Sequence, residues 1–142
     1  MIILDTDVVS LVLGRESEVR ERILSRIDMA RRSEAVVTTI ITYEEQIRGW
    51  FKVLSRAKTL RDAIGAYERL SKYVEDYRTL TVVRFNEGAA VAFQRLQGEK
   101  LRLGTMDLRI AAIVLANDAT LWSRNLRDFE RIPGLRVADP GR

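Results

Sequence analysis

Cysteine and histidine are both absent from this chain of 142 residues, and proline occurs only twice. Without cysteine the protein can form neither disulfides nor thiolate metal sites, which is typical of a reducing compartment. Without histidine there is no imidazole for a Ser/His/Asp relay or for histidine-ligated zinc. Catalysis by this chain would therefore depend on carboxylates, hydroxyls, amides and basic side chains.

Long apolar runs are also absent. No window approaches the roughly 18 apolar residues of a membrane span, and no basic region precedes an apolar stretch at the N-terminus. We therefore expect a soluble, cytoplasmic protein that folds as a single domain over residues 1–142. Lys and Arg number 24 against 20 Asp and Glu. Most of these basic residues are Arg, whose planar guanidinium group suits phosphate oxygens. Charge alone, however, favours a polyanion-binding surface no more than an ordinary soluble surface with scattered charges.

Strand-like and helix-like segments alternate along the chain. Continuous apolar or β-branched runs predict strands at 1–4, 35–41, 81–83, 120–123 and 135–137. Helical spacing predicts a short turn up to Gly14, then helices at 17–30, from Thr42, at 59–77, from Asn86 and at 106–116, the last apolar nearly all round. This alternation predicts an α/β fold with a parallel or mostly parallel sheet.

Acidic residues follow strands or begin helices at four places in this layout. Strand C-termini and helix N-termini share one edge of a βαβ sheet, so we expect these side chains to meet there. Carboxylates that lie close together repel one another unless a cation binds. Because the chain offers oxygen ligands only, the cation would be Mg²⁺ or Mn²⁺. The four candidate ligands are Asp5, Glu45, Asp107 and Asp128, with Asp7, Ser123 and Asn125 as supporting residues.

Purely structural roles stay open for each acid. Asp5 could cap the helix that follows the first strand. Thr42 and Glu45 have the spacing of a capping box, and an acid at Asp107 is favoured by the helix dipole. Asp128 could simply pair with a nearby arginine, either Arg124 or Arg131.

Four stretches carry these residues in order: Ile3–Asp7, Thr42–Gly49, Gly104–Ala112 and Ser123–Phe129. They resemble the motifs of the PIN-domain family, and most closely those of VapC-type toxins from bacterial and archaeal toxin–antitoxin pairs. The resemblance implies a three-layer α/β/α sandwich with a central parallel sheet. It also implies an endoribonuclease that needs Mg²⁺ or Mn²⁺, forms homodimers and is inhibited by a small antitoxin. Asp5, Glu45 and Asp107 match the family's three near-universal acids, and Asp128 matches its more variable fourth.

The chain departs from the family pattern in two places. Asp7 stands where Asn or Ser is common, and Ser123 stands where Thr is common. The stretch between Trp50 and Thr79 is long for the smallest members of the family, and we expect it to form a helical pair used in dimerisation. Basic side chains are expected to hold the RNA backbone, with Arg102, Arg109 and Arg124 as candidates.

Three alternative functions remain. A housekeeping RNA- or DNA-processing nuclease of the same family would have the same site but no adjacent antitoxin gene. The Asp5–Val8 stretch also resembles the first motif of haloacid-dehalogenase-type phosphatases, in which Asp5 would be a nucleophile and Asp7 an acid/base. That chemistry needs a lysine near the phosphate, and the lysines here lie in helices or loops that do not fit. An inactive nucleic-acid-binding or partner-binding module is the third alternative, against which the intact acids argue.

Overall fold

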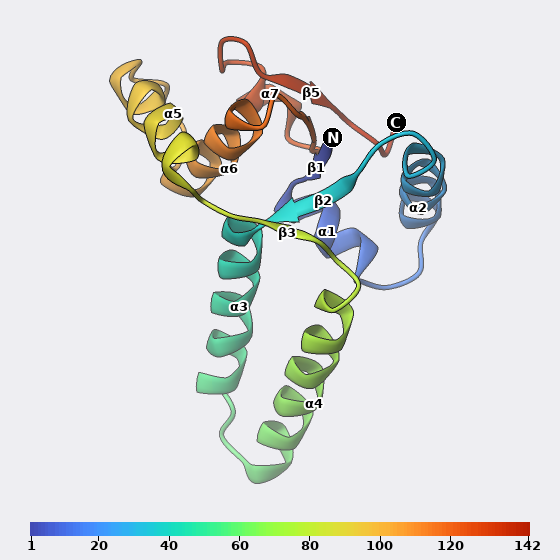
Figure 1. Ribbon diagram of the computed structural model, residues 1–142. Helices are drawn as coiled ribbons and strands as arrows, with labels where there is room; N and C mark the ends of the chain where they lie inside the picture. Colours follow the sequence, from blue (N-terminus) through green and yellow to red (C-terminus); the bar gives the residue numbers. More distant parts are fainter.

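The structure, a computed structural model, describes all 142 residues. Five strands form one parallel sheet in the order β3-β2-β1-β4-β5. The alternation predicted from the sequence is confirmed (Figure 1). The strands are β1 (Ile2–Leu4), β2 (Val36–Thr39), β3 (Val82–Val83), β4 (Thr120–Trp122) and β5 (Arg136–Ala138). The helices are α1 (Thr6–Val12), α2 (Glu18–Ala30), α3 (Ile40–Ser55), α4 (Leu60–Tyr77), α5 (Glu87–Gly98), α6 (Thr105–Ala116) and α7 (Leu126–Phe129).

Helices cover both faces of the sheet, as the central strand shows. Side chains of a strand point alternately to its two faces. Ile3 of β1 belongs to a core built with α5 and α6, whereas Ile2 and Leu4 belong to a second core built with α1 and α2. The predicted three-layer α/β/α sandwich with a parallel sheet is therefore confirmed. No helix is both long and apolar enough to cross a membrane.

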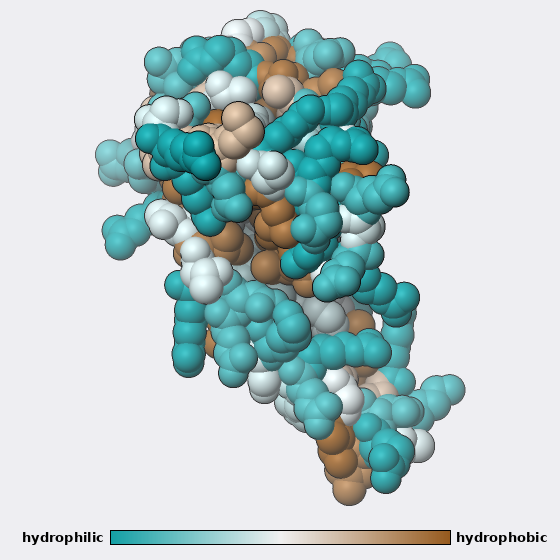
Figure 2. All heavy atoms as spheres, turned by 90° about the vertical axis from the view of Figure 1, so that its right-hand side faces the viewer, coloured by the Kyte–Doolittle hydropathy of each residue, from teal (hydrophilic) through white to brown (hydrophobic).

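Helices α3 and α4 form a hairpin that projects from the sheet (Figure 1). The side chain of Gln46 in α3 ties the two helices together. Its Oε1 accepts hydrogen bonds from the hydroxyl groups of two buried tyrosines of α4, Tyr73 at 2.8 Å and Tyr77 at 2.7 Å. The predicted helical pair is thus present. Hydrophobic atoms show at the tip of the hairpin, at the lower end of Figure 2. The use of this pair in dimerisation stays a prediction.

Most predicted element boundaries are shifted by one or two residues, and the shift at the start of α3 affects a candidate ligand. The second strand ends at Thr39, whose Oγ1 accepts the N–H of Thr42 at 3.1 Å, so Thr39 is the N-cap of α3. The β-branched Ile40 and Ile41 therefore lie in the helix, because burial of Ile41 in the core outweighs its weak helix propensity. Similarly, α6 begins at Thr105 itself, with no side-chain cap.

The order of the strands reverses between β1 and β4. The chain passes from β1 outward to β2 and β3, then crosses back to β4 and continues to β5 on the other side. In open parallel sheets ligands bind outside the carboxyl ends of strands at such a reversal. The residues that follow Leu4 and Trp122 lie at this place.

Candidate active site

Asp5 leaves β1 at the reversal point and is almost fully buried. Its side chain is 5% exposed, and its Oδ2 accepts a hydrogen bond from the Oγ of the fully buried Ser123 at 2.8 Å. Burial and then the charge of Asp7 raise the pKa of Asp5 to about 7, against the opposing effect of Ser123. Asp5 is the N-cap residue of α1 but makes no side-chain capping hydrogen bond, so the capping role is wrong.

Glu45 lies in the second turn of α3 and not in the first turn as predicted. Thr6, the first residue of α1, donates from Oγ1 to Glu45 Oε1 at 2.7 Å. This contact joins the start of α1 to α3 beside Asp5. The capping box is wrong, because Thr39 caps the helix. The neighbouring Glu44 instead pairs with Arg48 at 2.6 Å on the surface.

Asp107 stands in the first turn of α6 and is half-buried. Burial raises its pKa, and the charges of Glu45, Asp128 and Asp7 raise it further, in that order. Three other acids thus act on Asp107 at once. The structure therefore brings the predicted acids to one region at the sheet edge.

Asp128, in α7, is held by an amide and not by an arginine. Asn125 donates from Nδ2 to Asp128 Oδ2 at 3.0 Å, and the Asn125 N–H donates to Ser123 Oγ at 2.9 Å. Neither Arg124 nor Arg131 forms an ion pair with Asp128. The pairing role is therefore wrong, and the predicted supporting residues Ser123 and Asn125 each hold an acid.

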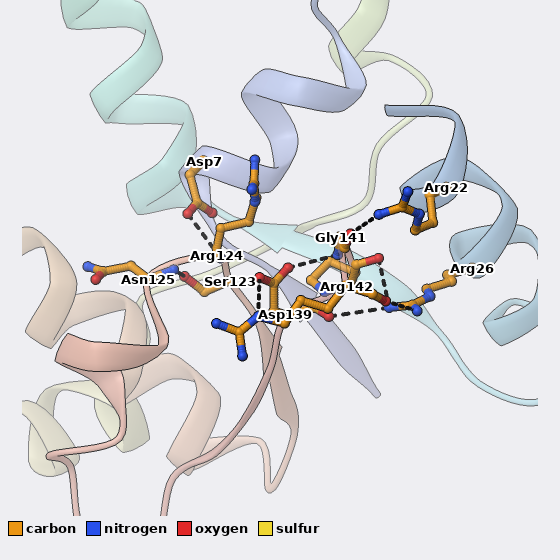
Figure 3. A network of polar contacts seen from close by, with 10 residues as sticks. Asp7, Arg22, Arg26, Ser123, Arg124, Asn125, Asp139, Gly141 and Arg142 are labelled. Atoms are coloured by element: carbon orange, nitrogen blue, oxygen red, sulfur yellow. Dashed lines mark hydrogen bonds and ion pairs between the residues drawn. The ribbon is translucent and has the colours of Figure 1, made fainter. Parts of the chain in front are cut away.

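Asp7 is joined to the other acids of the site through a main-chain hydrogen bond. The backbone N–H of Arg124 donates to Asp7 Oδ2 at 3.0 Å (Figure 3). The other oxygen, Oδ1, is the single buried side-chain polar atom in the chain without a hydrogen-bond partner. Burial raises the pKa of Asp7, while the backbone N–H groups of Arg124 and Val8 oppose this effect. A main-chain donor leaves no signal in residue types, which is why sequence patterns missed it.

Comparison with known proteins identifies the family to which this fold belongs. The PIN domain profile matches residues 2–135. The chain belongs to the PIN-domain family. Ribonuclease VapC1 of Haemophilus influenzae strain R2866 is 26% identical over 136 residues, which cover 96% of this chain and 95% of the relative. The family resemblance read from the four motifs is thus confirmed.

Solved structures share the fold of this PIN domain over its whole length. A chain of VapBC2 from Rickettsia felis, bound to a DNA fragment from their promoter, aligns with a TM-score of 0.78 at 21% identity and 98% coverage of both chains. A chain of VapBC-1 from nontypeable Haemophilus influenzae aligns with a TM-score of 0.73 at 24% identity and full coverage of both chains. At these identities the likeness concerns the fold.

The oxygen ligands that these acids offer suit a hard divalent cation, but the side chains do not lie close enough together to coordinate one. As the side chains lie, no group of three or more acids is close enough to hold a metal ion. Their mutual effect on the pKa of Asp107 nevertheless shows that their charges repel, which a bound cation would relieve. The unpartnered Oδ1 of Asp7 adds another oxygen with unmet hydrogen-bonding capacity. Carboxylate, hydroxyl and amide oxygens suit Mg²⁺ or Mn²⁺.

The three basic residues predicted to hold RNA differ in their surroundings. The guanidinium carbon of Arg109 lies 5.6 Å from the centre of the Phe93 ring, a cation–π contact on the buried helix α6. Arg102 is exposed in the loop before α6. Arg124 reaches the acids through its backbone. The phosphatase alternative needs a lysine near the phosphate. Lys72 instead forms an ion pair with Asp76 at 2.8 Å on α4, away from the acids.

Proposed function

We propose that this PIN-domain protein is a metal-dependent endoribonuclease that hydrolyses RNA phosphodiester bonds and acts as the toxin of a toxin–antitoxin pair. The observation that carries the proposal is the gathering of acids at the strand reversal, where three other carboxylates raise the pKa of Asp107. Similarity to a named ribonuclease along 96% of the chain supports RNA as the substrate.

Each of three acids has one oxygen held and the other free of side-chain hydrogen bonds. Ser123 holds Asp5, Thr6 holds Glu45 and Asn125 holds Asp128. This leaves each carboxylate oriented and still able to bind on its second oxygen.

The proposed ligands are these three acids together with Asp107. A cation bound by them would lower the pKa of a water molecule and neutralise charge on the scissile phosphate. The chain itself orients the carboxylates and keeps their charges in a partly dry site. This division of work explains how a chain without histidine could hydrolyse RNA.

A small antitoxin, a homodimer and a cytoplasmic location belong to the same proposal. Structural similarity to chains of solved VapBC assemblies, whose fold this chain shares, supports the antitoxin. The exposed hydrophobic side chains on the α3–α4 hairpin, such as Leu60 at 80% exposure and Tyr67 at 60%, support a protein interface there.

Cleavage of structured RNAs in Mn²⁺ and in EDTA tests the proposal. We expect cleavage with Mn²⁺, none in EDTA, and at least a tenfold loss in Asp107→Asn, which removes a charge that a cation needs. The matched control is Asp28→Asn, an exposed acid on α2, which should cleave like the wild type. Equal cleavage in chelator, or full activity of Asp107→Asn, would contradict the metal site.

A further inference from the structure

Three consecutive residues after β4 control three carboxylates of the site. Ser123, Arg124 and Asn125, which we call the carboxylate loop, donate hydrogen bonds to Asp5, Asp7 and Asp128 respectively. A small displacement of this loop would therefore move three acids together. The loop is tied to β5, because the Ser123 N–H donates to the carbonyl of Ala138 at 3.0 Å.

The 139–142 segment continues directly from Ala138 and is held by two arginines of α2. Backbone carbonyls outside a sheet need other donors when they are buried, and Pro140 and Gly141 are buried. Arg22 and Arg26 donate to a main-chain oxygen of each residue of the segment (Figure 3). Arg22 Nη1 donates to Gly141 O at 2.6 Å, Arg26 Nη1 to Asp139 O at 3.3 Å and Pro140 O at 2.9 Å, and Arg26 Nη2 to Arg142 O.

The clamped segment passes beside the side chain of Arg124 at Gly141. A Cβ atom at this position would lie 3.4 Å from Arg124 Nε on one side and 3.4 Å from Val19 Cγ1 of α2 on the other. It would also lie 3.1 Å from Asp139 Oδ1, which accepts the Gly141 N–H at 2.7 Å. Glycine avoids this close contact with Asp139 Oδ1, and the backbone at this position lies near both the side chain of Arg124 and α2.

We propose that Arg22 and Arg26 are positioning residues for the metal-binding carboxylates. By clamping the 139–142 segment to α2 they fix the end of β5 that binds Ser123 and the backbone that lies beside Arg124, and so keep the carboxylate loop in place. Neither arginine touches an acid of the site. Arg26 spans three carbonyls with its fork, whereas Arg22 donates to one, so the fork of Arg26 is the part that lysine could not replace. The inference rests on the proposed function only for its effect on metal binding.

Two measurements test the clamp, one of them without metal. Amide hydrogen exchange of Arg124 and Asn125 in EDTA reports on the loop alone, and calorimetry reports the dissociation constant for Mn²⁺. In Arg26→Gln we expect at least tenfold faster exchange at both amides and about tenfold weaker Mn²⁺ binding, the lower end of losses seen for outer-shell partners. Arg22→Lys should stay near the wild type, because Nζ can still donate to one carbonyl.

The matched control is Arg136→Gln. Arg136 also donates to backbone carbonyls, those of Asp118 at 2.5 Å and Ala119 at 3.4 Å, but at the opposite end of β4 and β5. It should change neither measurement. If Arg26→Gln does not fold, Gly141→Ala keeps both arginines, crowds Asp139 Oδ1 within the clamped segment and carries the same two expectations.

Unchanged exchange at Arg124 and Asn125 would overturn the inference. Faster exchange with unchanged Mn²⁺ affinity would also overturn it, since the clamp would then be purely structural. If the wild type binds no Mn²⁺, the proposed function fails, and amide exchange alone decides whether the clamp positions the loop. Faster exchange in the control as well would show general destabilisation and reject the specific path through the 139–142 segment.

Discussion

Removing the charge of Asp5 should stabilise the metal-free protein. The carboxyl is 5% exposed, and burial together with Asp7 raises its pKa from the ordinary 3.8 to about 7. Between these values the folded protein holds a proton that the unfolded chain has released, so the free energy of unfolding falls as the pH rises from about 4 to about 7. In Asp5→Asn the amide keeps the shape and can still accept from Ser123, but it has no charge to bury.

The size of the effect follows from the two pKa values. Their difference of about 3, at about 1.4 kcal/mol for each pKa unit, corresponds to about 4 kcal/mol of unfolding free energy. Asp5→Asn should therefore be more stable than the wild type by about 4 kcal/mol at pH 8, and by less than about 2 kcal/mol at pH 5. A bound cation would offset the same repulsion, so metal should stabilise the wild type far more than the variant.

Urea unfolding in EDTA at pH 5 and pH 8 measures this difference, and repeating it with Mn²⁺ measures the effect of metal. Asp28→Asn, at an exposed position on α2, should change stability by less than about 0.5 kcal/mol at either pH. A variant less stable than the wild type at pH 8, or a difference independent of pH, would refute the reasoning.

Two further predictions concern α3. Glu45→Gln can keep the hydrogen bond from Thr6, so its free energy of unfolding should change by less than about 1 kcal/mol while most RNA cleavage is lost. Glu44→Gln should keep cleavage, and the reverse pattern in a cleavage assay would contradict the assignment of Glu45 as the ligand. Gln46→Leu removes the shared acceptor of two tyrosine hydroxyls and should cost about 2 kcal/mol in urea unfolding, and a loss no larger than that of the exposed Gln97→Leu would contradict this.

Sequence patterns predicted the sheet because its strands are β-branched and buried on both sides. They failed where local preference and packing disagree, as at Ile40 and Ile41, which resemble a strand yet begin α3. This error placed the N-cap at Thr42, three residues after the true N-cap Thr39, and so made Glu45 look like part of a capping box. The acid itself was still predicted, because the family motif depends on its place in the chain and not on the exact start of the helix.

The site could be predicted to the level of its acids but not of what orients them. Ser123 and Asn125 were visible as polar residues after a strand. Hydrogen bonds from a main-chain N–H, such as that of Arg124, have no sequence signature. The clamp by Arg22 and Arg26 was also out of reach, because it joins residues more than 110 positions apart through backbone carbonyls that every residue possesses.

The two departures from the family pattern inside the site have opposite consequences. Ser123 keeps both functions of a hydroxyl, since its Oγ donates to Asp5 and accepts the N–H of Asn125. Serine, although smaller than threonine, therefore keeps the hydrogen bonds that the hydroxyl makes in this buried network. Asp7 does change the site, because an amide could accept from Arg124 equally well but would not add the charge that raises the pKa of Asp5. Asp7 therefore makes the metal-free site more strained electrostatically and increases what a bound cation would relieve.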